Sequence, residues 1–296
     1  MRLSTMLLFV PVVSLAFFAC VSAGPAPPKR RAFIPRPITS YEPKDTMLRL
    51  RGGAGPLDAV DTAKAASTIA LVSGTLHSIS ASKLLQAYGC PQTPVFEHCL
   101  RTIGASVLGV GIPSWCLLNG KCSSTNTAVG LSILPWMTSL LKTVVDNDGS
   151  SGVKIAPQLL VLLYDAFTAH ALFTDAEYAS KALQVFCVWV LANGVLLVVS
   201  PKTAATSWGN NDEPEDQVVS MTKTNGFGLL SYGAFVYALS QDINTAKSLG
   251  YSLVPWLIDN VSRNFITKEV ETYGHESGPQ MFWLLYFIIV IASTAL

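Results

Sequence analysis

The chain has 296 residues, of which 50% are hydrophobic and only 13% are charged. A soluble domain covers its outside with polar groups and carries roughly a quarter charged residues, so this composition argues against a water-exposed globular protein. The formal net charge of +1 argues against a nucleic-acid binder, which needs a concentrated basic surface.

Residues 1–23 have the pattern of a secretory signal peptide. Arg2 supplies the positive start, residues 7–20 the apolar stretch, and Val21-Ser22-Ala23 a cleavage site of small residues. The alternative is a first transmembrane helix, but Pro11 interrupts the apolar run. We therefore predict a signal peptide that brings the chain into the secretory pathway.

Residues 24–64 are predicted to be a disordered tail, a candidate transit peptide. Its first part, residues 24–56, is rich in proline and in Lys and Arg, so it cannot bury apolar surface. A signal peptide before such a tail resembles the two-part leaders of plastid proteins in algae with secondary endosymbionts. Those leaders favour an aromatic residue directly after cleavage, whereas Phe33 lies further along. A plastid membrane is one predicted location, and the endomembrane system or plasma membrane is the other.

Eight apolar segments follow, and each is a candidate membrane-spanning helix. A span needs about 20 mainly apolar residues, and the fourth, fifth and eighth segments come closest to this length. The segments are Ala65–Ser82, Ile103–Leu118, Thr127–Val145, Ile155–Phe173, Ala182–Ser200, Gly226–Ser240, Thr245–Asp259 and Gln280–Leu296.

The eight segments form two similar sets of four. Gly130-Leu-Ser-Ile-Leu-Pro-Trp136 returns as Gly250-Tyr-Ser-Leu-Val-Pro-Trp256, and Ala156-Pro157-Gln158 returns as Gly278-Pro279-Gln280. A period this long indicates a duplicated small domain. We predict an all-α polytopic membrane protein with two four-helix repeats, over residues 65–176 and 177–296.

Short landmarks also recur after the first segment of each set, Tyr88-Gly89 and Trp208-Gly209. With the leader and the repeat, this pattern resembles uncharacterised multi-pass membrane proteins of algae with complex plastids. The resemblance covers residues 65–296, rests on short motifs and implies no activity.

The basic residues support the count of eight spans. The connections after the first, third, fifth and seventh segments, with the adjoining segment ends, hold eight of them, and the opposite connections hold three. These are Lys83, Arg101, Lys142, Lys154, Lys202, Lys223, Arg263 and Lys268 against Lys121, Lys181 and Lys247. This bias agrees with the positive-inside rule. Because four is an even number, both repeats cross the membrane in the same direction, which excludes a simple inverted repeat.

Paired prolines and one acidic residue are the candidates for function. Pro135 and Pro255 lie inside the third segment of each repeat, where proline removes a backbone hydrogen bond and kinks the helix. The two kinks either frame a central cavity or serve as packing bends beside tryptophan.

Asp165 lies in an otherwise apolar segment, between Tyr164 and His170. A carboxylate in the bilayer costs at least about 2.5 kcal/mol and normally faces a partner or water. Five residues separate Asp165 from His170, so these two side chains should not touch on a helix, and His77 is a candidate partner. The group is either an intramembrane polar site or a buried structural hydrogen bond.

Enzyme signatures such as a phosphate loop, a GxSxG elbow or an HExxH motif are missing, and the histidines and cysteines have no metal-ligand spacing. We predict no catalytic residue, no metal site and no cofactor. Clustered glycines in the second segments favour close helix packing, and they are also compatible with a bound pigment or lipid.

Three functions remain open at this stage. The first is a structural or accessory protein that packs with a membrane complex or with lipid, and the second is a transporter or channel for a small solute or ion. The third is an intramembrane enzyme, since such enzymes often lack short motifs.

Overall fold

A computed structural model describes residues 58–122, 124–145, 153–174, 177–209 and 213–295. Within these residues the chain forms eleven α-helices and no sheet, only an isolated β-bridge between Val153 and Gly209. The all-α prediction is therefore confirmed. The predicted signal peptide and most of the predicted tail lie outside the described residues.

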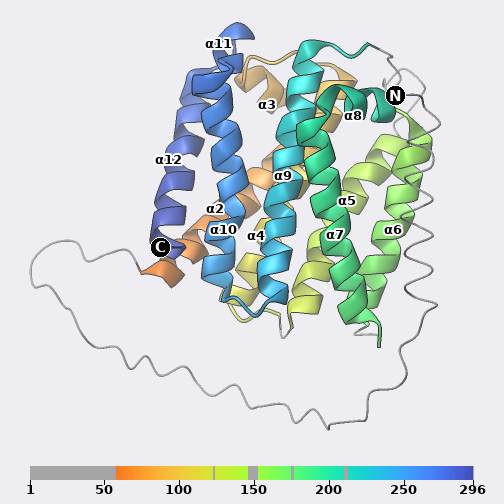
Figure 1. The fold of residues 1–296 in the computed structure, drawn as a ribbon, viewed down its shortest axis with the longest axis vertical. Helices are drawn as coiled ribbons and strands as arrows, with labels where there is room; N and C mark the ends of the chain where they lie inside the picture. The colour runs from red at the N-terminus through yellow and green to blue at the C-terminus, as the bar shows by residue number, and fades with distance from the viewer. Residues whose placement is uncertain (1–57, 123, 146–152, 175–176, 210–212, 296) are drawn as a thin grey trace, which may run out of the picture. The chain divides into compact units, whose positions relative to one another are not determined.

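Eight long helices run alternately up and down, side by side, in one bundle (Figure 1). They are α2 (Ala59–Ile79), α4 (Pro94–Leu118), α5 (Thr125–Val145), α6 (Ile155–Phe173), α7 (Ala179–Val199), α9 (Asp216–Ser240), α10 (Thr245–Val261) and α12 (Ser277–Thr294). Three short helices lie at the upper end of the bundle in this view (Figure 1). They are α3 (Ala81–Ala87), α8 (Pro201–Trp208) and α11 (Glu269–Thr272), and a π-helical turn, η1 (Ser262–Ile266), continues α10.

Five of the long helices, α4, α5, α6, α7 and α12, are long and apolar enough to cross a membrane. They indicate a membrane location and a lipid bilayer as the surroundings of the protein. The helices of the other three predicted spans, α2, α9 and α10, are more polar or shorter. For example, α9 carries Asp216 and Lys223, and α10 has only 17 residues.

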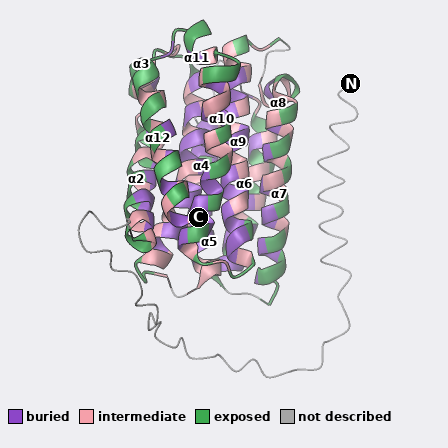
Figure 2. Cartoon of the chain, turned by 60° about the vertical axis from the view of Figure 1, so that its left-hand side comes forward, coloured by how far each residue is buried: buried purple, intermediate pink, exposed green. Residues whose placement is uncertain are grey.

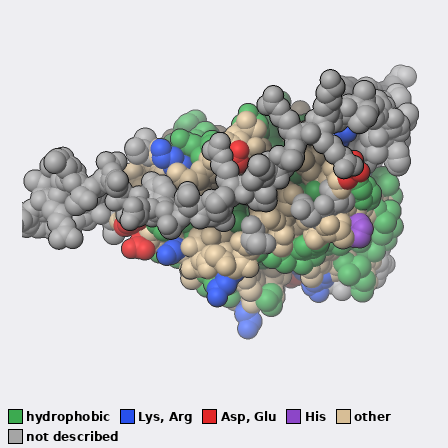
Figure 3. Space-filling model, turned by 90° about the horizontal axis from the view of Figure 1, so that it is seen from below, with side chains coloured by type: hydrophobic (Ala, Val, Ile, Leu, Met, Phe, Trp, Pro, Cys, Tyr) green, Lys and Arg blue, Asp and Glu red, His purple; other side chains and the backbone are tan. Residues whose placement is uncertain are grey.

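The outer faces of the bundle are apolar. Buried residues line the contacts between helices, and exposed residues face outward (Figure 2). Large aliphatic and aromatic side chains are exposed along α6, α7 and α12, among them Leu163, Val188, Val195, Phe282 and Leu285. Continuous exposed apolar surface of this kind is unusual for a soluble protein and suits contact with lipid tails. Seen from the lower end, the few charged side chains are scattered over the visible surface (Figure 3).

Several helix boundaries differ from the predicted ones. The helix α6 has the predicted bounds, but α4 begins at Pro94 and α9 at Asp216, well before the predicted segments. The side chain of Thr93 caps α4 by accepting a hydrogen bond from Phe96 N, and Pro94 takes the first turn, where proline is favourable. A search of the sequence for apolar residues misses helix starts that are polar. In the same way α2 begins at Ala59, inside the predicted tail.

Glycines set the closest helix contacts. A Cβ added at Gly74 of α2 would lie 3.0 Å from the carbonyl oxygen of Gly104 in α4. A Cβ added at Gly194 of α7 would lie 3.0 Å from the carbonyl oxygen of Gly226 in α9. Backbones this close leave no room for a side chain, which is how small residues pack helices in membranes.

The centre of the bundle is formed by α4 and α9, which pack against each other. A Cβ at Gly109 would lie 2.9 Å from the ring of Tyr232, a side chain with no exposed surface. The Tyr232 hydroxyl lies 2.5 Å from the Ser132 hydroxyl of α5, and Ser106 Oγ donates to the carbonyl of Thr102. The polar groups in this contact are thus paired with protein groups, and the contact is close-packed.

Candidate functional site

A cavity of about 140 Å³ lies between α2 and α4 on one side and α9, α10 and α12 on the other. Its walls along the bundle are apolar and aromatic, and include Val107, Leu253, Trp256, Trp283 and Phe287. The last turn of α10 and the first turns of α12 supply its polar end, together with η1 and the α11–α12 loop. The polar residues are Asp259, Asn260, Arg263, His275 and Gln280.

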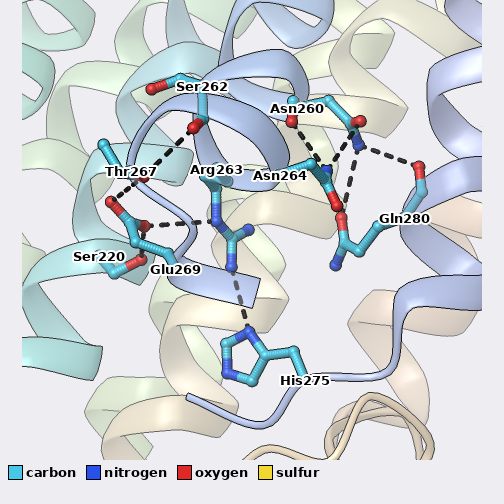
Figure 4. A network of polar contacts seen from close by, with 9 residues as sticks. All are labelled: Ser220, Asn260, Ser262, Arg263, Asn264, Thr267, Glu269, His275 and Gln280. Atoms are coloured by element: carbon cyan, nitrogen blue, oxygen red, sulfur yellow. Dashed lines mark hydrogen bonds and ion pairs between the residues drawn. The ribbon is translucent and has the colours of Figure 1, made fainter. Parts of the chain in front are cut away.

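A charged network forms this polar end (Figure 4). Arg263 lies with Nε 3.5 Å from Oε2 of Glu269, and its Nη2 lies 3.3 Å from Nδ1 of His275. Ser220 of α9 donates a hydrogen bond of 2.5 Å to the same Glu269 oxygen, and Thr267 donates one of 3.0 Å to Oε1. The network therefore ties α9, η1, α11 and the following loop together.

An amide cluster continues the polar end toward α12 (Figure 4). Asn260 Nδ2 donates to the backbone carbonyl of Gln280 at 3.2 Å. Asn264 Nδ2 donates to the carbonyl and to the side-chain oxygen of Asn260, at 2.8 and 3.1 Å. These bonds join the end of α10 to the start of α12, so the cavity wall at this point is held in place.

Two turns at this end of the cavity require glycine because of their backbone conformation. Gly274 has φ +66° and Gly89 has φ +70°, values that L side chains rarely adopt. The turns at these glycines bring the loop after α3 against the loop after α11, where Glu276 N donates to the Tyr88 carbonyl at 3.3 Å. Loops from opposite ends of the chain thus close the same end of the cavity.

The protonation of His275 follows from its partner. An arginine is always a donor, so Nδ1 of His275 accepts the hydrogen bond from Arg263, and the neutral ring carries its proton on Nε2. Nε2 is buried and has no hydrogen-bond partner within the described residues. Burial and the neighbouring Arg263 charge hold the pKa of His275 below its ordinary value of 6.5, against a smaller opposite effect of Glu269.

This shift predicts a pH dependence of stability. Below pH 6.5 the unfolded chain protonates His275 while the folded chain does not, so stability falls as the pH drops through this value. We expect the melting temperature in detergent to fall on acidification, and to fall less in His275→Gln. Equal slopes for the two proteins would contradict the assignment, because other histidines contribute equally to both.

His77 and Tyr88 form a second polar pair in the cavity wall. His77 Nδ1 donates to the carbonyl of Ser73 at 2.6 Å, which leaves Nε2 to accept a hydrogen bond from the Tyr88 hydroxyl at 3.2 Å. The candidate partner of Asp165 therefore lies in this cavity instead, with partners of its own.

The other predicted site residues lie elsewhere. Asp165 is buried in α6, and it makes no hydrogen bond to His77 or His170 in the described part of the chain. His170 is exposed, and Tyr164 packs its ring against Phe186 and Trp189.

Pro135 and Pro255 lie inside α5 and α10 as predicted, but neither belongs to the lining of the cavity. Asp165 is also absent from that lining. The cavity between α2, α4, α9, α10 and α12 is therefore not framed by the two prolines, and the alternative that the prolines are packing bends stays a prediction.

Sequence reasoning missed the polar end of the cavity. The sequence analysis counts Arg263 only as a basic residue near a membrane surface and Asp259 only as the end of an apolar segment. A signal was present, because Asp259, Asn260 and Arg263 stand 120 residues after Ser139, Leu140 and Thr143, which are less polar or uncharged.

No protein family, curated protein or solved structure matched this chain in comparisons of its sequence and fold. Among the described residues, no group of three or more His, Cys, Asp or Glu side chains is arranged to hold a metal ion. The function is therefore argued from the geometry of the chain itself.

Proposed function

We propose that this chain is an integral membrane protein of the structural or accessory kind, which packs with lipid and with subunits of a membrane complex. The observation that carries the proposal is the close-packed contact between α4 and α9 at the centre of the bundle. A transporter would need a continuous polar path between its two halves. Here glycines, Tyr232 and paired serines fill that position.

We propose further that all eight long helices cross the membrane, as two parallel four-helix repeats. Two of the four equivalent helix pairs match in length, which supports this: α2 and α7 have 21 residues each, and α4 and α9 have 25 each, whereas α5 and α10 have 21 and 17. In both α5 and α10 the two residues after the proline are half-buried, the next is exposed, and the following two are buried. These similarities support the proposed repeat.

Single cysteines would test this topology. In a background without native cysteines, residues 83, 202 and 268 should react with a membrane-impermeant maleimide from one side only, and residues 121, 181 and 247 from the other. All six positions are exposed lysines in loops or at helix ends, so the Lys→Cys changes should not disturb packing. A mixed pattern within either set would contradict eight spans.

Membrane integration and location need separate measurements. We expect the protein to stay in the pellet after alkaline carbonate extraction, and a soluble fraction would contradict integration. A fluorescent fusion would then distinguish the proposed plastid membrane from the endomembrane system or plasma membrane. Proteins that co-purify with the tagged chain would identify the partner complex.

A transporter or channel remains the second candidate, and buried Asp165 in α6 is the observation that favours it. We expect Asp165→Asn to change accumulation of the protein or solute flux in proteoliposomes if Asp165 forms an intramembrane site. Unchanged accumulation and unchanged flux would exclude that site.

A further inference from the structure

The cavity has unused hydrogen-bonding groups at its polar end. Within the described residues, Oδ1 of Asp259, Oγ1 of the neighbouring Thr224 and Nε2 of His275 are buried without a hydrogen-bond partner, and all three residues line the cavity. Asp259 is 3% exposed and His275 is 9% exposed. A buried polar atom left unpaired costs about 1–3 kcal/mol, so an unpaired acceptor and an unpaired donor on residues that line one cavity point to a ligand.

The charges at this end nearly balance. The guanidinium of Arg263 is paired with Glu269, and Asp259 interacts electrostatically with Arg263 and with Lys223. Two cationic side chains therefore lie among two carboxyl groups, and no excess positive charge remains for a phosphate or a fatty-acid carboxylate. The polar end suits an uncharged head group that both donates and accepts hydrogen bonds.

The size and walls of the cavity define the rest of the ligand. A cavity of roughly 150 Å³ with an apolar lining holds one benzene ring, so about 140 Å³ suits a single six-membered ring. Trp256, Trp283 and Phe287 supply flat surfaces, with the rings of Trp256 and Phe287 stacked at 6.5 Å. The cavity is partly open, which lets an apolar tail continue outside it.

We propose that this cavity binds a neutral lipid whose head is a hydroxylated ring. The hydroxyl group accepts a hydrogen bond from Nε2–H of His275 and donates one to Asp259, while the ring packs against the tryptophans. Sterols and reduced isoprenoid quinones share this chemistry. The inference rests on the proposed membrane integration and names the lipid that the protein takes up.

The residues at the equivalent positions of the first repeat indicate that only the second repeat forms a site of this kind. Ser139 and Thr143 stand where the second repeat has Asp259 and Arg263. Ala66 of α2 corresponds to Phe186 of α7. The ring of Phe186 packs against Tyr164 and Tyr232. The ring of Phe186 therefore takes up space at the second position, and we expect one lipid per chain.

Photolabelling of the full chain in phosphatidylcholine nanodiscs tests the proposal. Photoreactive analogues of a sterol and of a quinol are added in separate arms, with photoreactive phosphatidylcholine as the comparison. We expect saturable labelling in the sterol or the quinol arm, competed by the unlabelled lipid and mapped to α10 or α12. Equal labelling by phosphatidylcholine, or no saturable labelling in either arm, would overturn the proposal.

Two pairs of variants connect the labelling to the cavity. Val107→Phe fills the cavity from α4 and should abolish saturable labelling, whereas Ile112→Phe on the same helix, outside the lining, should not. His275→Leu removes one hydrogen bond and should weaken binding roughly tenfold, and His275→Gln, which keeps a donor, should weaken it less. Labelling that Val107→Phe and His275→Leu leave intact would place the lipid elsewhere.

The outcomes also separate this inference from the proposed function. A chain that resists carbonate extraction but takes no ring lipid would disprove only the ligand. A chain that carbonate removes from membranes would disprove the membrane assignment itself.

Discussion

Arg263→Met is expected to lower the free energy of unfolding by about 3–5 kcal/mol, the usual cost of removing one partner of a buried ion pair. The side chains of Arg263 and Glu269 are only 10% and 17% exposed. Without the guanidinium, Glu269 keeps the hydroxyl groups of Ser220 and Thr267 but loses its counter-charge. Equilibrium unfolding in detergent micelles, followed by helical circular dichroism, measures the change.

Two further variants make this prediction specific. Arg263→Met combined with Glu269→Gln removes both charges and should recover part of the loss, because no buried charge is left unpaired. Lys202→Met removes an exposed positive charge on α8 and should change stability by no more than about 0.5 kcal/mol. The network would have no structural role if Arg263→Met were as mild as Lys202→Met.

Gly104→Ala is expected to lower the free energy of unfolding by about 1–3 kcal/mol, the usual cost of overpacking. The new Cβ would lie 2.7 Å from Cβ of His77 and 2.9 Å from the carbonyl oxygen of Gly74. Both atoms are fixed to the backbone of α2, so the two helices must move apart. This loss outweighs the gain of about 1 kcal/mol that alanine has over glycine inside a helix.

Gly233→Ala is the matched control for this effect. Its new Cβ would lie 2.6 and 2.7 Å from Cδ2 and Cγ of Leu191, side-chain atoms that can move away by a change of rotamer, while the nearest backbone atom of Leu191 lies 3.4 Å away. We therefore expect Gly233→Ala to be neutral or stabilising under the same unfolding measurement. If both alanine variants behave alike, close contact between the backbones of α2 and α4 does not limit stability.

Much of the fold could be predicted from the sequence, because apolar runs define helices that face lipid or other helices. The bounds of α6 were predicted as the structure has them, and Pro135 and Pro255 were placed inside helices correctly. The short helices α3, α8 and α11 were missed. They are too short and too polar to stand out from connecting segments in a count of apolar residues.

The candidate site was harder to predict for a physical reason. Its polar residues come from the end of α10, η1, the loop before α12 and the start of α12, and their meeting depends on the π-helical turn after α10 and on the positive φ of Gly274. Neither feature has a strong local pattern. Asp165 was conspicuous because it interrupts an apolar run, whereas Asp259 was inconspicuous because it lies near a helix end, although both are buried.

The polar network includes η1 and α11, and α11 lies with α3 at one end of the bundle (Figure 1). The aromatic residues that line the cavity, Trp256, Trp283 and Phe287, belong to α10 and α12. In a bilayer this arrangement would give the bound lipid a single orientation. A bound lipid whose hydroxyl group lies near Arg263 has its head at one membrane surface and the rest of the molecule in the monolayer below that surface. The protein would then bind this lipid from one leaflet of the bilayer and not from the other.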